Sequence, residues 1–481
     1  MVEAPELQSP EWWLDRLYEQ LLERRKYVEL MRCYCEGDHP LPLIADKARE
    51  AFRRLLRQAR SNYVGLVADA TSERIQVDGF RLGDGEAGDP EAWRIWQANN
   101  LDADADLLIS EAVRVGRSFA LVAPNPADRS TPIVTAEDAT QAIVAYVPGS
   151  RRERAAGLKC WLDDWTGQLM ATVYLPGGLF KYQAPAPKTG ESQGKPKWRP
   201  RQVEGEAWPA PNPLGAVPLV ELQNRPDLLG EAHSEVEDVL DIQDRINKTL
   251  IDRLMAQEFS AFRQRWATGY ELPEDDQGQP VEPFKAAVDR LWVAEDPNVK
   301  FGEFSATDLT PYLKATDADV QHMAARTRTP AQYLLGQLSN VNGETLKATE
   351  SGLVSKVRQR QRPLGEGLEE VVRLYLAAAG DTRDLARIET IWHNPEFRTE
   401  GELVDALVKM STLGVPREAL WERWGASQTE IAQWREQADE QASRILGGDV
   451  ASLYGPKPDQ PAPADQPVTD ETAGAGSGDA A

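Results

Sequence analysis

The sequence predicts an α+β protein that is mainly helical, and three observations support this expectation. Long stretches repeat apolar residues every three or four positions, which is typical of helices that bury one face. Residues 117–183 instead form short β-branched and aromatic runs separated by Gly-containing turns, a spacing typical of an antiparallel meander. The 481 residues, 41% of them hydrophobic, are enough for about two to four domains.

The residues before this block read mostly as helices. An exception is 75–83, where apolar residues alternate around Asp78-Gly79 and predict a short hairpin. After the block, the Pro-, Gly- and Lys-rich residues 184–215 predict an irregular loop. The helical periodicity covers 9–60, with a second helix at about 43–68, and then 90–100 and 101–115.

Two long helices are expected on either side of a small insert. The first begins at Ser234, which forms a capping box with Glu237, and runs to Trp266. Its ~33 residues would span ~50 Å at the rise of an α-helix. The second covers 305–328, and the insert at 270–304 combines an acidic Pro/Gly turn with strand-like runs.

A polar loop and a long helix follow. Residues 338–343 are rich in Gly and Asn, and Asn342 is placed to cap a helix that continues to Gly380. Pro363 lies inside this helix, where it removes a backbone hydrogen bond, so we expect a kink there. Taken alone, the pattern also fits a core helix hairpin of an ordinary all-α domain. Four basic residues precede the expected kink: Lys356, Arg358, Arg360 and Arg362.

The formal net charge of −23 argues against a protein that grips nucleic acid over a broad surface. No apolar run approaches the ~20 residues of a membrane span, and the N-terminal residues lack the layout of a secretion signal. We therefore expect no membrane contact and a location in the cytoplasm of the cell that makes the protein. The three cysteines, Cys33, Cys35 and Cys160, are too sparse for a disulfide framework.

No catalytic signature stands out. The chain lacks G-x-x-x-x-G-K-[ST], G-x-S-x-G and H-E-x-x-H, and its four histidines are scattered. The alternating Asp102, Asp104 and Asp106 lack the Gly and Glu of a calcium loop. We therefore expect no enzyme, no cofactor and no metal, and a hydrolase built on acidic residues is the weakest alternative.

Five segments carry a resemblance to a known family: 61–81, 111–122, 230–254, 306–336 and 339–376. They resemble portal proteins of tailed bacteriophages, of the type found in long-tailed phages that infect actinobacteria. The resemblance covers roughly residues 10–445 and is distributed rather than concentrated in one signature. Heavy use of Ala, and of Arg over Lys, suits a GC-rich genome.

The resemblance implies a portal fold with a wing, a two-helix stem, a small α/β clip, a kinked channel helix and a helical crown. After residue 447 the Pro-, Ala- and Gly-rich composition predicts a disordered tail, 447–481. The implied parts are the wing 1–233, first stem helix 234–268, clip 269–304, second stem helix 305–329, tunnel loop 330–343, kinked helix and wing return 344–395, and crown 396–446.

The resemblance also implies a function. The chain would form a ring, usually a dodecamer, at one capsid vertex of the virion, assembled in the host cytoplasm with the major capsid and scaffolding proteins. The terminase large subunit would package double-stranded DNA through it without reading sequence, and head-completion or adaptor proteins would bind afterwards. The alternative is a cytoplasmic helical scaffold or adaptor protein without DNA contact.

Specific residues follow from this resemblance. The tunnel loop would present short polar side chains to DNA, with Lys347 as the nearest cation. The acidic turn of the clip would dock the motor, and Pro363 would set the kink. For the four basic residues before Pro363, inter-subunit salt bridges are favoured over DNA contact. The residues are Gln337, Ser339, Asn340, Asn342 and Lys347 for DNA, and Glu271, Glu274, Asp275 and Asp276 for docking.

Overall fold

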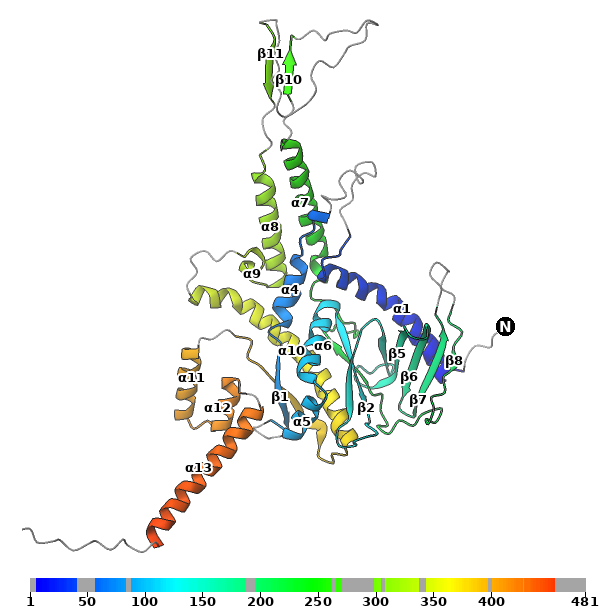
Figure 1. The fold of residues 1–481 in the computed structure, drawn as a ribbon, viewed down its shortest axis with the longest axis vertical. Coiled ribbons are helices and arrows are strands. Elements are labelled where there is room, and N and C mark those ends of the chain that lie inside the picture. The colour runs from blue at the N-terminus through cyan, green and yellow to red at the C-terminus, as the bar shows by residue number, and fades with distance from the viewer. Residues whose placement is uncertain are drawn as a thin grey trace, which may run out of the picture. The chain divides into compact units, whose positions relative to one another are not determined.

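The computed structural model describes residues 6–40, 57–83, 88–186, 195–261, 265–269, 298–303, 308–336, 343–396, 400–426 and 428–454. The chain divides into two compact units, Met1–Gln428 and Thr429–Ala481. The fold is mixed α/β and mainly helical (Figure 1). The packing described below lies within the first unit.

The meander expected at 117–183 is confirmed as part of two antiparallel sheets. Five strands follow one another in the order β4-β5-β6-β7-β8, and a second sheet has the order β3-β2-β9. The strand β9 lies far from β2 in sequence, so the second sheet is closed by a long-range pairing. The bounds are β2 (Arg117–Ala123), β3 (Ile133–Glu137), β4 (Ala142–Tyr146), β5 (Arg154–Asp163), β6 (Gln168–Leu175), β7 (Gly178–Pro185), β8 (Arg199–Pro200) and β9 (Leu219–Gln223).

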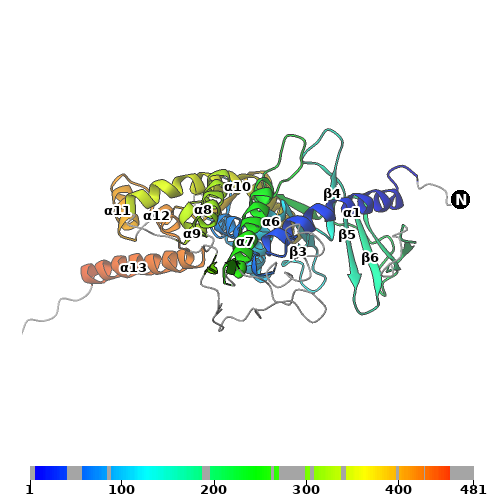
Figure 2. The same cartoon turned by 90° about the horizontal axis from the view of Figure 1, so that it is seen from above.

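The first helix, α1 (Pro10–Cys35), joins two hydrophobic cores. The Ser9 hydroxyl caps it by accepting a hydrogen bond from the Trp12 amide at 3.2 Å. Its first half packs Leu14, Leu17 and Leu21 on the five-stranded sheet, and its second half enters the main core. Figure 2 shows α1 lying along β4, β5 and β6.

The hairpin expected at 75–83 is wrong. This segment is a single strand, β1 (Val77–Leu82), which pairs antiparallel with β12 (Ile388–Trp392). Gly79 sits at an irregularity of this ladder and not in a turn, because the partner strand comes from the other end of the unit. The continuous helix expected at about 43–68 is also wrong, because Asn62 caps a new helix, α4 (Tyr63–Ser72).

Both long helices are present, with different boundaries from those expected. The first does not start at Ser234 but follows a 3₁₀ turn, Glu237–Val239, as α7 (Leu240–Ala261). Trp266 lies in a strand, β10 (Arg265–Thr268), because this segment pairs with β11 (Lys300–Glu303). The second long helix is α8 (Thr310–Thr327), with a proline in its first turn. In Figure 1, α7 and α8 lie side by side and lead to β10 and β11.

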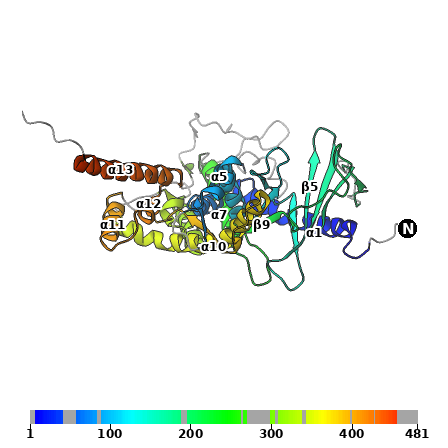
Figure 3. The ribbon, with the colours of Figure 1, turned by 90° about the horizontal axis from the view of Figure 1, so that it is seen from below.

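The long helix with the internal proline is α10 (Gly343–Ala379), and it is central to the main core. It packs against the sheet of β2 and β9 and against β12. Figure 3 shows α10 beside β9 from below. The close approach depends on Gly367, because a Cβ there would lie 3.2 Å from Leu222 Cγ and 3.3 Å from the Glu221 carbonyl oxygen. The other α-helices that the structure describes in this unit are α5 (Pro90–Ala98), α6 (Leu101–Val115), α9 (Ala331–Leu335), α11 (Glu400–Thr412) and α12 (Arg417–Trp424).

Two further expectations need correction. The stretch 330–343 is not a loop throughout, because α9 occupies its beginning. The tail expected from residue 447 is helical at its start, since α13 (Gln428–Tyr454), most of which belongs to the second unit, continues through Tyr454. Only Ala451 and Leu453 of this stretch favour a helix by propensity, so its helical form is the continuation of the preceding turns of α13, which a compositional argument does not consider.

Candidate functional site at the base of the paired helices

The residues expected to contact DNA and a docking partner fall mostly outside the part of the chain that the structure describes. This holds for Gln337, Ser339, Asn340 and Asn342, and for Glu271, Glu274, Asp275 and Asp276. Lys347 lies in α10, but its side chain is not among those described. Pro363 lies inside α10, which stays helical on both sides of it. The candidate site is therefore built from the elements that flank these segments.

The paired helices share a core only at the end nearer the sheets. The Arg245 guanidinium lies 2.7 Å from the Asp319 carboxylate and links the two helices at their surface. Further along, over 310–318, Thr316 is the one buried residue of α8, and Leu313 is 47% exposed. This part of the pair has little packing within its own chain. The shared core includes Ile246, Leu250, Ile251, Val320 and Met323.

Buried amide side chains fasten α7 to the segment before α4. The Gln243 side chain accepts a hydrogen bond from the Tyr63 amide at 3.0 Å and donates to the Ser61 carbonyl at 2.6 Å. Asn247, one turn later, accepts from the Ser61 amide at 3.1 Å and contacts His39. Burial lowers the pKa of His39. Sequence reasoning missed these residues, although two amides four positions apart on an apolar helix face are a usable signal.

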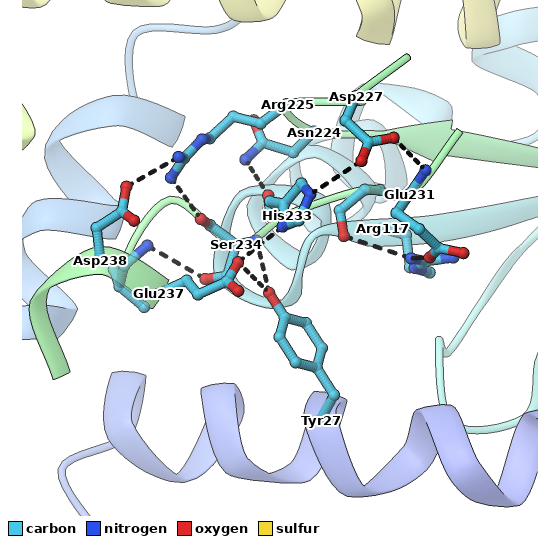
Figure 4. A network of polar contacts seen from close by, with 12 residues as sticks. Tyr27, Arg117, Asn224, Arg225, Asp227, Glu231, His233, Ser234, Glu237 and Asp238 are labelled. Atoms are coloured by element: carbon cyan, nitrogen blue, oxygen red, sulfur yellow. Dashed lines mark hydrogen bonds and ion pairs between the residues drawn. The ribbon is translucent and has the colours of Figure 1, made fainter. Parts of the chain in front are cut away.

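The entry to α7 is held by a polar network that converges on Ser234 (Figure 4). The Ser234 hydroxyl donates to the Arg114 carbonyl at 2.6 Å and accepts from the Val236 amide at 3.2 Å. Tyr27 of α1 donates to Glu237 at 2.8 Å and accepts from the Ser234 amide at 3.0 Å. The expected capping box is thus replaced by contacts to α1 and α6, which position the paired helices on the sheets.

A buried ion pair supports the entry to α7 from the side of the sheet. The segment 231–239, which lies between β9 and α7, is called the junction below. The Arg117 guanidinium of β2 lies 2.9 Å from Glu221 of β9, and both side chains are buried. Arg117 also contacts the Glu231 carboxylate at 3.2 Å and the Ala232 carbonyl at 3.3 Å. Removing one partner of such a pair would leave an uncompensated buried charge, which is costly. The ion pair therefore holds β9, the strand that leads into the junction, against β2.

The long helix α10 is tied to this junction by Glu235. Its carboxylate, 3% exposed, accepts from Arg360 Nε at 2.8 Å and lies 3.5 Å from Lys356 Nζ. Burial opposes ionisation, but the two cations outweigh it and hold the pKa of Glu235 below its ordinary value. Burial also lowers the pKa of Lys356 to about 8, against the effect of Glu235. The junction therefore concentrates positive charge.

Three of the four basic residues before Pro363 find partners within the chain. Lys356 and Arg360 pair with Glu235, and Arg358 lies 2.6 Å from the Glu396 carboxylate. These three side chains therefore do not need a salt bridge to another subunit to balance their charge. Arg362 is exposed.

Within the described ranges, no group of three or more acidic, His or Cys side chains is arranged to hold a metal ion. No helix in those ranges combines the length and the apolar character needed to cross a bilayer.

Comparison with known proteins places these elements in context. The sequence profile of the family described as phage portal protein, SPP1 Gp6-like, matches residues 14–444. The portal protein of Mycobacterium phage D29 is 32% identical over 412 residues, covering 81% of each chain. The portal protein of Mycobacterium phage L5 is 30% identical over 446 residues, covering 88% of each chain.

Proposed function

Because the chain belongs to the phage portal protein family, we propose that it forms a dodecameric ring through which a terminase motor packages double-stranded DNA. Membership of the family implies a homo-oligomeric ring at a capsid vertex. The observation that best supports the ring is the exposure of α8 over 310–318, which is hardly packed within one chain. Helices of this kind gain most of their stability from neighbours, and a ring supplies them on both sides.

In this proposal each part has a place in the ring. The helices α7 and α8 are the stem, and β10 and β11 with the residues between them are the clip that meets the terminase large subunit. The loop before α10 faces DNA, and α10 connects it to the wing. The major capsid and scaffolding proteins contact the ring during assembly in the host cytoplasm, and head-completion proteins bind the clip later.

Charge is compatible with DNA passing through without being held. A chain with a formal net charge of −23 repels a polyanion on average, which lowers friction in a channel. Short polar side chains such as Asn340 and Asn342 contact phosphates weakly and carry no sequence information. Passage is therefore independent of sequence.

The ring is tested by measuring the mass of the purified chain at micromolar concentration, with and without its scaffolding protein. The expected result is a closed assembly of uniform subunit number. A strictly monomeric mass in both conditions and at several salt concentrations would reject the ring and would favour the helical adaptor instead.

A further inference from the structure

The loop at residues 225–231 is held rigidly while it presents two leucines to solvent. The Asp227 carboxylate accepts hydrogen bonds from the amides of Leu229 at 2.8 Å and Glu231 at 2.9 Å. The Arg151 guanidinium donates to the Asp227 carbonyl at 2.7 Å. Yet Leu228 is 89% exposed and Leu229 is 90% exposed. Figure 4 shows Asp227 held between His233 and Glu231.

These leucines do nothing for the fold of the single chain. An exposed leucine side chain buries no apolar surface and so adds no hydrophobic stabilisation. The fixed backbone also prevents the loop from folding back to cover Leu228 and Leu229. A single exposed apolar residue is ordinary, but two adjacent ones on a pinned loop form a preorganised contact. The loop is therefore suited to a surface outside the chain.

A positively charged cavity adjoins this loop. Its volume is about 390 Å³, and Arg225 and Pro226 of the loop line it. Five cationic side chains face two carboxylates there, which leaves an excess of three positive charges in a chain that is otherwise strongly acidic. The cationic residues of this basic cavity are Arg225, Arg326, Arg328, Lys356 and Arg360, and the carboxylates are Glu235 and Asp238.

Two of the cavity's arginines have strained backbones. Arg225 has a φ of 47° and Arg328 a φ of 54°, values that L-residues rarely adopt. Arg328 follows the last turn of α8, where Gly or Asn is usual. Arg225 is held by the Ser234 carbonyl and Asp238, both at 2.9 Å, but in the described chain the Arg328 guanidinium has no partner. Backbone strain of this kind occurs most often at binding and active sites, where the surrounding structure holds the residues in place.

We propose that the 225–231 loop and the basic cavity form one side of the interface between neighbouring subunits, occupied by an apolar, carboxylate-bearing surface of a second copy of this chain. The inference rests on the proposed ring. In a ring each subunit contacts its two neighbours through two different surfaces. An exposed apolar and basic patch is suited to be one of these two surfaces. Because the copies carry like net charge, a basic cavity at their boundary offsets repulsion and fixes the register.

Covalent crosslinking tests the occupant directly. The photoreactive residue p-benzoylphenylalanine replaces Leu229 in the full-length chain, and Trp165 in a control. Trp165 is 97% exposed at the turn between β5 and β6, away from the loop. In assembled rings, we expect light to produce chain-to-chain crosslinks from position 229 and not from position 165. Crosslinks from position 229 to DNA or to another protein only, or none at all, would overturn the proposal.

Substitution provides a second, independent test. The double variant Leu228→Asp/Leu229→Asp and the variant Arg328→Glu should each lower the fraction of chains in rings by about tenfold or more. Trp165→Asp is the matched control and should assemble normally. Because the leucines are exposed in the single chain, the melting temperature of the monomer should not change.

The outcomes separate this inference from the proposed function. Rings formed normally by the wild type and by both variants would refute the interface and leave the portal ring intact. Rings formed normally by Arg328→Glu but with reduced DNA retention would show that the cavity binds phosphate and not a second copy. A wild type that never forms rings would refute the ring and the interface together.

Discussion

At the scale of single residues, Glu235 connects three elements of the subunit. Its backbone amide donates to the Val113 carbonyl at the end of α6, at 2.9 Å. Its carboxylate receives Lys356 and Arg360 of α10. No local sequence pattern distinguishes this glutamate from the many others in the chain, because its partners lie more than a hundred residues away. Its importance comes from burial, which the sequence does not reveal.

Replacing Glu235 with Gln should destabilise the subunit by about 3–5 kcal/mol, since two buried cations lose their counter-charge. The cations hold the pKa of Glu235 below its ordinary value. The stabilisation is therefore present at neutral pH and is lost as the pH falls through that lowered pKa. Chemical denaturation at neutral and acidic pH measures both effects.

The control for this prediction is Glu366→Gln, which removes an exposed carboxylate from α10, the helix that carries Lys356 and Arg360. It should change the free energy of unfolding by no more than about 0.5 kcal/mol. Equal stability of the two variants at neutral pH would contradict the role assigned to Glu235.

At the scale of elements, sequence periodicity predicted helices and strands better than it predicted their partners. The alternation at 75–83 does mark a strand, but the strand pairs with β12 and not with itself. Ser234 does stand at the entry to a helix, but its hydroxyl bonds to Arg114 and the helix starts later. In both cases a contact from a distant part of the chain decided between local alternatives that the sequence left open.

The loop before α10 gives a prediction about DNA. Replacing Asn340 and Asn342 with Asp would place two negative charges per subunit against phosphate and should slow packaging, with rings still forming. Replacing both with Gln keeps the polarity and is the matched control. Packaging by the Asp variant at the wild-type rate would mean that another element faces the DNA.

Pro363 gives a prediction about the direction in which the loop before α10 points. Replacing it with Ala restores a helix donor, so the stability of the subunit should not fall. The kink expected there would relax, the loop would point elsewhere, and we expect rings to assemble while packaging fails. Image averages of the variant rings and a packaging assay measure the two effects. Normal packaging would show that the proline does not set the direction of the loop.

The acidic turn of the clip gives a prediction about docking. Reversing the charges at Glu274, Asp275 and Asp276 to Lys should slow association with the terminase large subunit at low salt, since surface charges act mainly on the association rate. The effect should shrink as salt screens the charges. An unchanged association rate at low salt would remove the docking role from this turn.

At the scale of the whole molecule, the subunit is incomplete by itself. The exposed part of α8 and the leucines of the 225–231 loop are not covered within the described chain, and the basic cavity beside them is lined by three more cations than carboxylates. The family resemblance in the sequence predicted a ring, but no residue-level pattern predicted which surface would join the copies. That surface depends on backbone geometry at Arg225 and Arg328, which only the structure supplies.

The most direct test of the ring is electron microscopy of the assembled protein viewed along its axis. We expect closed rings with a central channel lined by α7 and α8, and with the 225–231 loop at the boundary between neighbouring subunits. Particles without a channel, or only single chains at micromolar concentration in the presence of the scaffolding protein, would contradict this expectation.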